Sequence, residues 1–559
     1  MSGHEPADRD HRGRGPRGQR RDGAPRDGDR PGNGDRPGNG DRPGNGDRPG
    51  SGGPRRAAGA PSDRGRPGNR NAHRPGGARR SGGRGGAEGP DAARTAAADT
   101  LEAVATSDAY ANLVLPKVLR ERGLTGRDAA FATELVYGTL RLRGRYDAIL
   151  ARCTKDRPLE QIDPPVLDLL RLGAHQLLGM RVPPHAAVSQ TVALVRARVG
   201  QGPSGFVNAV LRAVGRQDLD AWLAQLASET DDDGARLAVV ESHPAWVVRA
   251  MRSSLRSHGR PADELAELLR ADNAPPSVTL VARPGLISPD ELVEQVGGTL
   301  GQDATPGRWA PTALRLPAGD PAALPAVRES RAGVQDEGSQ LVALALAAAP
   351  VTSADDGPPQ ERRWLDMCAG PGGKSALLGA VAAQRGVHLV ANEVAPHRAR
   401  LVRQSAAGLP RDSIEVRTGD GRDVGAEEPG LYDRVLVDAP CTGLGALRRR
   451  PEARWRRRPE DLPVLTTLQR ELLESALQAV RPGGVVAYVT CSPHLAETSA
   501  VVADVLRGRD DLTRLDARAA LTEAAGTDVP ALGEGPDVQL WPHLHGTDAM
   551  FLSLIRRDR

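Results

Sequence analysis

Large apolar side chains are missing from the first 90 residues, which contain no Val, Ile, Leu, Phe, Tyr or Trp. Of these residues, 37 are Gly or Pro, and the hexapeptide Asp-Arg-Pro-Gly-Asn-Gly occurs three times between Asp29 and Gly46. Such a segment cannot bury enough apolar surface to offset the loss of chain entropy on folding. We therefore predict that residues 1–90 form a disordered tail rich in Arg, Gly and Pro.

The chain also lacks long apolar runs and has few cysteines. No stretch of 18 apolar residues occurs, which excludes a membrane span, and the Arg-rich start has no apolar segment typical of a secretory signal. Four cysteines are too few for a disulfide framework, and their spacing matches no metal site. These absences predict a cytoplasmic protein with reduced thiols and no bound metal.

Positive charge is concentrated in the predicted tail. Residues 1–90 hold 20 Arg, no Lys and 11 acidic residues, a net charge of +9, whereas the whole chain has a net charge of +4. An Arg/Gly-rich arm can contact the phosphates of a nucleic acid, or it can simply keep a protein soluble. The composition leaves both interpretations open.

The hydrophobic pattern divides the rest of the chain into three predicted domains. Residues 91–217 have apolar residues at helical spacing with short Gly/Pro turns, which predicts an all-α domain. Residues 228–234 are expected to be a linker, and residues 240–350 predict a small α+β connecting subdomain. In residues 351–559, short apolar runs alternate with helices, which predicts an α/β domain with a parallel, Rossmann-like doubly wound sheet. Its expected strands are 364–367, 387–391, 414–416, 434–437, 485–490 and 550–555.

A glycine-rich turn follows the first of these strands and opens a helix. Its glycines let a ligand approach the backbone, and the helix N-terminus favours an anionic or polar group. The spacing matches neither a phosphate P-loop nor the dinucleotide fingerprint. Glu393, at the end of the next strand, is placed to accept hydrogen bonds from both hydroxyls of a ribose. The pattern predicts a nucleoside-bearing cofactor without a required pyrophosphate, which S-adenosylmethionine fits. The turn consists of Cys368, Ala369, Gly370, Pro371, Gly372, Gly373 and Lys374.

Two cysteines follow two further strands, in the segments Asp438-Ala-Pro-Cys441 and Thr490-Cys491-Ser492. A thiolate that adds to carbon 6 of a pyrimidine makes carbon 5 nucleophilic enough to accept a methyl group, and a base then removes the carbon-5 proton as the thiolate leaves. Asp438 is placed to act as an acid near N3 and the exocyclic amine. Either cysteine alone is more often a small core residue, but two beside a cofactor loop favour catalysis.

Seven arginines surround one tryptophan between Arg448 and Arg458. A run of charge is normally a solvated surface. Beside a pyrimidine site, however, arginines can bind phosphates and the tryptophan can stack on a flipped base. The predicted RNA-binding residues are Arg448, Arg449, Arg450, Arg454 and Trp455.

The segments Asp366–Ser375, Asp438–Gly443 and Thr490–Ser492 together resemble the motifs of the Sun/Fmu (RsmB) family of RNA cytosine-5 methyltransferases. The segments Gly126–Arg141 and Phe206–Arg212 resemble the NusB-like RNA-binding domain of the RsmB branch. The resemblance implies Cys491 as the nucleophile and Cys441 as an aid to product release. It also implies that S-adenosylmethionine is held by the turn Cys368–Lys374, Glu393, Asp420 and Asp438.

The sequence departs from the family pattern at three positions. Gly370, Ser375 and Glu393 stand where the family usually has Ala, Thr and Asp, and the tail has no counterpart. The implied activity is methylation of cytosine carbon 5 in 16S ribosomal RNA, naked or within a pre-30S particle, by a monomeric cytoplasmic enzyme. Methylation of tRNA by the same machinery is an alternative. A non-catalytic RNA-binding assembly factor is another, which the thiol pair disfavours.

Overall fold

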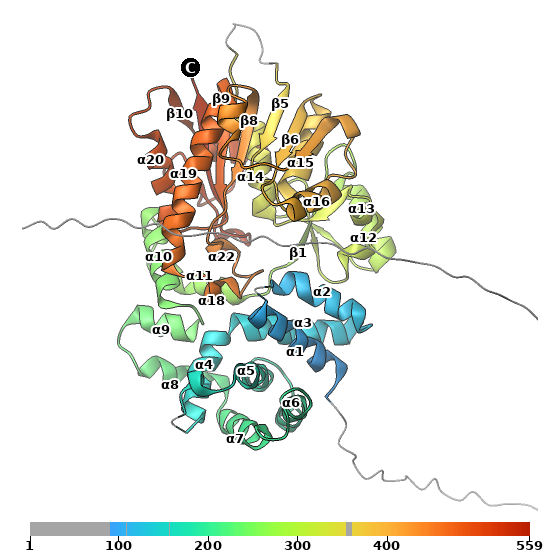
Figure 1. Ribbon diagram of the computed structural model, residues 1–559, viewed down its shortest axis with the longest axis vertical. Coiled ribbons are helices and arrows are strands. Elements are labelled where there is room, and N and C mark those ends of the chain that lie inside the picture. Colours follow the sequence, from blue (N-terminus) through green and yellow to red (C-terminus); the bar gives the residue numbers. More distant parts are fainter. Residues whose placement is uncertain (1–89, 108, 156, 354–359) are drawn as a thin grey trace, which may run out of the picture. The chain divides into compact units, whose positions relative to one another are not determined.

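The computed structural model describes residues 90–107, 109–155, 157–353 and 360–559 (Figure 1). These residues belong to a single structural unit. The predicted tail, apart from its last residue, lies outside the described part of the chain, and its disorder stays a prediction. Within the described ranges no helix is both long and apolar enough to cross a membrane.

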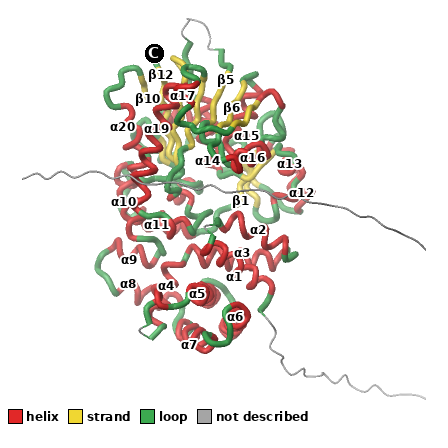
Figure 2. Tube along the Cα trace, in the orientation of Figure 1, coloured by secondary structure: helices red, strands yellow, loops and turns green. Residues whose placement is uncertain are grey.

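Helices and loops alone make up the described residues between 90 and 217 (Figure 2). Asp91 caps the first helix by accepting a hydrogen bond from Arg94 N at 2.8 Å, and two later helices begin with proline, whose missing N–H costs nothing there. Their apolar faces share one core around Leu135, Ile149 and Leu170. The all-α fold predicted for this segment is confirmed. Its α-helices are α1 (Ala92–Thr106), α2 (Ala111–Glu121), α3 (Gly126–Arg141), α4 (Arg143–Cys153), α5 (Pro164–Leu178), α6 (Pro184–Arg198) and α7 (Ser204–Val214).

The segment expected to be a linker contains the short loop of residues 229–232 between two helices. Residues 228–234 contain the end of α8 (Leu219–Ser228) and the start of α9 (Asp233–Val240). The acidic side chain of Asp232 accepts a hydrogen bond from Ala235 N and so caps α9. The loop is shorter than expected, because the end of the acidic cluster already belongs to a helix N-terminus, which favours acidic residues.

The next segment combines helices with a small antiparallel sheet, as predicted. Two helices, α10 (Ala245–Ser257) and α11 (Glu264–Asn273), precede four strands in the order β2-β3-β1-β4. The strands are β1 (Val278–Ala282), β2 (Thr305–Pro306), β3 (Ala313–Leu316) and β4 (Ala332–Val334), and the remaining α-helices are α12 (Pro289–Leu300), α13 (Pro325–Arg328) and α14 (Glu337–Ala348).

The C-terminal segment contains a second sheet in the order β10-β12-β9-β8-β5-β6-β7, with β11 paired to β12. From β5 the chain runs outward to β6 and β7, then crosses to β8 and β9 on the other side of β5. The carboxyl ends of β5 and β8 therefore flank a topological switch point, where doubly wound sheets bind ligands. The strands are β5 (Arg363–Asp366), β6 (His388–Asn392), β7 (Ile414–Arg417), β8 (Tyr432–Asp438), β9 (Val480–Thr490), β10 (Leu512–Leu515), β11 (Val538–Gln539) and β12 (Phe551–Arg557).

Helices cover both faces of this sheet (Figure 1). On one face, Leu341 of α14 and Leu377 of α15 share a core with Leu436 of β8. On the other face, Leu473 of α19 and Val501 of α20 share a core with Val486 of β9. The α-helices are α15 (Gly373–Gln384), α16 (Pro396–Ser405), α17 (Val424–Glu427), α18 (Ala453–Arg456), α19 (Leu462–Ala479), α20 (Ser499–Leu506), α21 (Ala517–Ala525) and α22 (Pro542–His545).

The sheet differs from the predicted parallel sheet at one edge. β12 pairs antiparallel with β9, with Phe551 opposite Thr490, and β10 pairs antiparallel with β12. All six expected strands are present. The two short strands β10 and β11 were not foreseen, because neither contains a continuous apolar run.

Candidate active site

The side chains of Cys441 and Cys491 meet at the carboxyl ends of β8 and β9. These strands are parallel neighbours, and Asp438, the last residue of β8, is paired with Val489. The two Sγ atoms lie 3.4 Å apart, a hydrogen-bond distance for sulfur, and both thiols are free and partly buried. The structure therefore brings together the two cysteines whose strand-end positions predicted a shared site.

Charged neighbours make the two thiols unequal. The hydrogen bond from Cys441 lowers the pKa of Cys491, and the positive charges of Lys374 and Arg450 lower it further against the effect of burial. The same hydrogen bond, burial and the negative charge of Glu497 raise the pKa of Cys441. The negative charge of Asp438 opposes the lowering of the Cys491 pKa. Either sulfur can donate at this distance, and the two pKa directions favour Cys491 as the thiol that ionises first and Cys441 as the donor.

Lys374 and Asp438 form an ion pair beside the thiols. Lys374 Nζ lies 2.8 Å from Asp438 Oδ2. Burial opposes the positive charge of Lys374, but the attraction of Asp438 outweighs it and raises the pKa of the lysine. Asp438 ends β8, and Lys374 lies in the first turn of α15. The pair thus joins the predicted cofactor loop to the predicted catalytic loop.

The turn between β5 and α15 requires glycine at two positions. A Cβ atom on Gly370 would lie 2.3 Å from Oε2 of Glu393. Gly372 has a φ of +108°, and a Cβ atom there would lie 2.8 Å from the Cα atom of Val402. Contacts with the neighbouring β6–α16 segment therefore demand these glycines, and they draw the backbone of the turn against Glu393.

Glu393 lies directly behind this turn and is 2% exposed. Its Oε2 accepts a hydrogen bond from Gly370 N at 3.0 Å, and its Oε1 accepts one from Ala395 N at 2.9 Å and pairs with Arg398. A carboxylate oxygen can accept two hydrogen bonds, so Oε2 keeps the capacity for one more. Bonding to both hydroxyls of a ribose, as the sequence predicted, requires the half-exposed Arg398 to move aside.

Two further aspartates lie at the same edge of the sheet. Asp420 follows β7, and the bidentate hydrogen bonds of Arg422 hold its pKa below the usual range. Asp366, which ends β5 and which the sequence reasoning missed, accepts a hydrogen bond from Ser375 Oγ at 2.6 Å. Burial raises the pKa of Asp366 to about 7. Its position as the last residue before a glycine turn was the signal that could have identified it.

Cys368 differs from the other two cysteines of this region. Burial, together with the negative charges of Asp366, Asp438 and Glu393, raises its pKa well above the usual range. Cys368 therefore stays a neutral thiol and is unsuited to nucleophilic attack. In the described part of the chain no group of His, Cys, Asp and Glu side chains is arranged to hold a metal ion.

Most of the predicted RNA-binding cluster is occupied by contacts within the protein. Arg454 is fully buried and donates hydrogen bonds to the carbonyl oxygens of Arg141, Ser242 and Asp272. The indole ring of Trp455 packs so closely on Gly144 of α4 that a Cβ atom there would lie 2.3 Å from it. These two residues join the catalytic segment to the helical segments. Full burial leaves Arg454 no surface for RNA, whereas RNA contact by the partly buried Trp455 stays a prediction.

The start of the cluster is also largely internal. Arg448 is 6% exposed, and both Arg448 and Arg449 pair with Asp548, while Arg449 also lies 2.6 Å from Asp336. Their charge is neutralised inside the protein, which leaves little for a phosphate. Arg450 is exposed and contributes to the low pKa of Cys491. RNA contact by Arg450 therefore stays a prediction.

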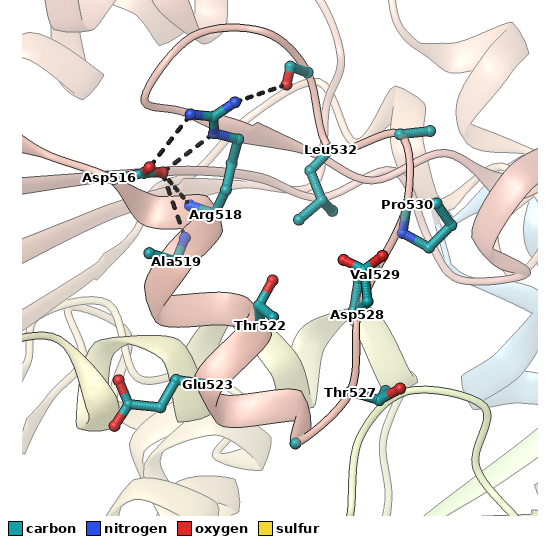
Figure 3. Close-up of a pocket in the computed structure, with 13 residues that line it drawn as sticks. Asp516, Arg518, Ala519, Thr522, Glu523, Thr527, Asp528, Val529, Pro530 and Leu532 are labelled. Carbon is teal, nitrogen blue, oxygen red and sulfur yellow. Dashed lines mark hydrogen bonds and ion pairs between the residues drawn. The ribbon is translucent and has the colours of Figure 1, made fainter.

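A broad surface hollow lies apart from the thiol pair (Figure 3). Residues 516–533, from α21 and the loop that follows it, line this hollow. Arg518 pairs with Asp516 at its edge. None of the predicted site residues contributes to it.

Comparison with known proteins identifies two parts of the chain. Residues 357–556 match the family model of the 16S rRNA methyltransferase RsmB/F, and residues 91–216 match that of the NusB family. The ribosomal RNA small subunit methyltransferase B of Pseudomonas putida is 30% identical over 449 residues, which cover 79% of this chain and 96% of that protein. The chain belongs to the RsmB family. It is accordingly an RNA methyltransferase with a NusB-type helical domain before the methyltransferase domain.

Two further proteins are similar to this chain over most of its length. Rv1407 of Mycobacterium tuberculosis is 52% identical over 466 residues, which cover 83% of this chain and 96% of that protein. The name of that protein describes it provisionally as a methyltransferase. The crystal structure of PH0851 superposes with a TM-score of 0.68 at 19% identity, covering 83% of this chain and 98% of that one. This likeness confirms the fold. The roles of individual residues in this RsmB-family chain stay predictions.

Proposed function

We propose that this chain methylates carbon 5 of a cytosine in 16S ribosomal RNA, with S-adenosylmethionine as the methyl donor, through a covalent bond between Cys491 and carbon 6. The observation that carries the proposal is the 3.4 Å distance between the Sγ atoms of Cys441 and Cys491 beside the Lys374–Asp438 ion pair. A binding module has no need of such a pair. The choice of RNA is supported by the name of the P. putida relative and by the NusB match.

The residues around the glycine turn fit a nucleoside-bearing methyl donor. The turn is drawn against Glu393, and two buried oxygens at this edge, Asp366 Oδ1 and Asn392 Oδ1, lack a partner among the described residues. The turn Cys368–Lys374, Glu393, Asp420 and Asp438 would hold S-adenosylmethionine. When bound, it supplies an electrophilic methyl group.

The thiol pair would prepare the base for methylation. The Cys491 thiolate adds to carbon 6, and the electron pair of the 5,6 double bond makes carbon 5 nucleophilic. Asp438 would bind the exocyclic amine. Lys374, 2.8 Å from Asp438, would supply the positive charge that stabilises the added electrons.

Release of the product would involve Cys441. After methylation a base removes the carbon-5 proton, the electron pair re-forms the 5,6 double bond, and Cys491 leaves as a thiolate. Cys441, the immediate neighbour of Cys491, is placed to assist this elimination. The hydrogen bond between the two sulfurs would also stabilise the leaving thiolate.

The test is methyl transfer from labelled S-adenosylmethionine to 16S rRNA and to tRNA, followed by bisulfite sequencing of both. We expect a single 5-methylcytosine in 16S rRNA and none with the Cys491→Ala variant, which should still bind the cofactor. Methylation of tRNA alone would favour the tRNA alternative. Transfer to neither RNA, or turnover by Cys491→Ala, would contradict the proposal.

A further inference from the structure

Glu497 is a fully buried carboxylate next to the thiol pair, in the 3-10 turn Leu495–Glu497. Its own position is fixed from two sides. The hydroxyl of Tyr488, on β9, donates to the Glu497 carbonyl oxygen at 2.8 Å. Gln469 Nε2, on α19, lies 3.3 Å from Glu497 Oε1 and donates to the carbonyl of Pro440 at 2.8 Å. A buried charge is costly unless it is bonded in this way.

The carboxylate of Glu497 connects the two loops that carry the cysteines. Thr442, directly after Cys441, donates its backbone N–H to Glu497 Oε1 at 2.7 Å and its hydroxyl to Oε2. Ser492, directly after Cys491, donates its hydroxyl to Oε2 at 2.7 Å. One side chain therefore bonds the neighbour of each thiol. Nothing in the sequence pattern indicated this role.

We propose that Glu497 is the positioning residue that holds Cys441 and Cys491 at hydrogen-bond distance with Cys441 as the donor. This inference deepens the proposed function and rests on it. Glu497 does not touch the reacting base in this account, since its carboxylate is enclosed by the two loops. It acts through Thr442 and Ser492, which fix the backbone at each cysteine.

The negative charge of Glu497 acts on the thiols unequally. It contributes to the raised pKa of Cys441, which keeps the proton on that sulfur. The other charged groups that face the thiols are Lys374, Asp438 and Arg450. Beside Glu497 itself the titratable neighbours are Cys441, Tyr488 and His494. Removal of the Glu497 charge should therefore reduce the difference in pKa between the two thiols.

The experiment measures alkylation of each cysteine by iodoacetamide across pH, with mass spectrometry of the full-length chain. Unsubstituted protein should react first at Cys491. In Glu497→Gln the ratio of alkylation at Cys491 to alkylation at Cys441 should fall several-fold. Ser492→Ala, which keeps the charge but loses one hydrogen bond, should lower the ratio less. It also serves as the second variant if Glu497→Gln does not fold.

A matched control is Asp433→Asn. Asp433 is also a buried carboxylate that accepts hydrogen bonds from backbone N–H groups, here those of Arg362 and Arg363. It is the second residue of β8, at the opposite end of the strand from the thiols. The Asp433→Asn substitution should lower the stability of the protein without changing the ratio of alkylation at Cys491 to alkylation at Cys441. An unchanged ratio in folded Glu497→Gln and Ser492→Ala, or the same change in Asp433→Asn, would overturn the inference.

Steady-state kinetics give the second measurement. Glu497→Gln should lower kcat by about 10- to 100-fold, the order expected for misplacement of a catalytic group, with KM for RNA within about twofold of normal. A rise in KM at constant kcat would overturn the positioning role. If the unsubstituted chain transfers no methyl group, the proposed function fails, while the alkylation ratio still decides whether Glu497 organises the thiols.

Discussion

In the proposed mechanism a single proton between two sulfur atoms distinguishes Cys491, the nucleophile, from Cys441. Cys441 and Cys491 have the same chemistry, and only their neighbours make them different. The positive charges of Lys374 and Arg450 act on Cys491 against the negative charge of Asp438, whereas the negative charge of Glu497 acts on Cys441. The division of labour between the cysteines is therefore an electrostatic property of the site.

Replacement of Lys374 tests this electrostatic account. Lys374 lowers the pKa of Cys491, so Lys374→Met should raise that pKa and move the acid limb of the kcat/KM profile to higher pH. Activity should fall most at low pH and recover in part at high pH. The measurement is the pH dependence of kcat/KM at saturating S-adenosylmethionine, with the cofactor Kd determined separately. A loss of activity that is uniform across pH would contradict this prediction.

At the residue scale the sequence predicted what depends on strand ends and missed what depends on tertiary contacts. Cys441 and Cys491 follow neighbouring strands of a parallel sheet, so their meeting could be predicted. Glu497 bonds to Thr442, and Arg454 to Arg141, across long stretches of the chain, and neither burial nor such a partner can be predicted from sequence spacing. The cluster around Arg454 was predicted to contact RNA because arginines are seldom buried.

At the scale of elements, the turn from β5 to α15 and the start of α16 fit each other closely. Glu393 Oε2 fills the space that a Cβ atom on Gly370 would need, 2.3 Å away. The family pattern usually has Ala and Asp at these two positions. Asp at position 393 is shorter than Glu, and Ala at position 370 is larger than Gly, so either combination fills the same space. We infer that Gly370 and Glu393 compensate each other.

A double-mutant cycle tests this compensation. Gly370→Ala alone should weaken S-adenosylmethionine binding and cost about 1–3 kcal/mol of stability, because the added methyl group overlaps Glu393. The double variant Gly370→Ala/Glu393→Asp should regain most of the S-adenosylmethionine affinity and most of the stability. The measurements are cofactor Kd by calorimetry and the free energy of unfolding. Additive losses in the double variant would contradict the inference.

The elements that the sequence predicted well are those buried on both faces. Continuous apolar runs occur in the sequences of β5, β6, β8 and β9, as expected for the strands of a parallel sheet that is covered on both faces. β10 and β11 are short and have no such run. The expected linker, residues 228–234, overlaps the first two residues of α9, because an acidic helix N-terminus resembles a polar loop.

At the scale of the whole described molecule, buried arginines connect the catalytic segment to the helices before it. Arg454, in α18, bonds to α3 through Arg141, to the α9–α10 junction through Ser242, and to α11 through Asp272. The loop after β8 is thereby bonded both to the thiol site and to the NusB-type domain. These contacts give the segment a structural role in place of the predicted RNA contact.

Arg454→Met should lower the free energy of unfolding by about 2–4 kcal/mol, because it leaves several buried carbonyl groups without a donor. Urea denaturation followed by circular dichroism measures this. Arg507→Met is the control, since Arg507 is 76% exposed and pairs only with Asp504 in the described contacts, and it should change stability by less than about 0.5 kcal/mol. Unchanged stability with a loss of RNA affinity in Arg454→Met would restore the sequence prediction.

The most direct test of the account is the covalent bond between Cys491 and the RNA. Cys441→Ala, incubated with S-adenosylmethionine and 16S rRNA, should accumulate a protein–RNA adduct that survives a denaturing gel, because release is slowed after methylation. The double variant Cys441→Ala/Cys491→Ala should form none. An adduct formed by the double variant, which lacks Cys491, would contradict the assignment of the two thiols. So would the lack of an adduct in a Cys441→Ala variant that still binds RNA and cofactor.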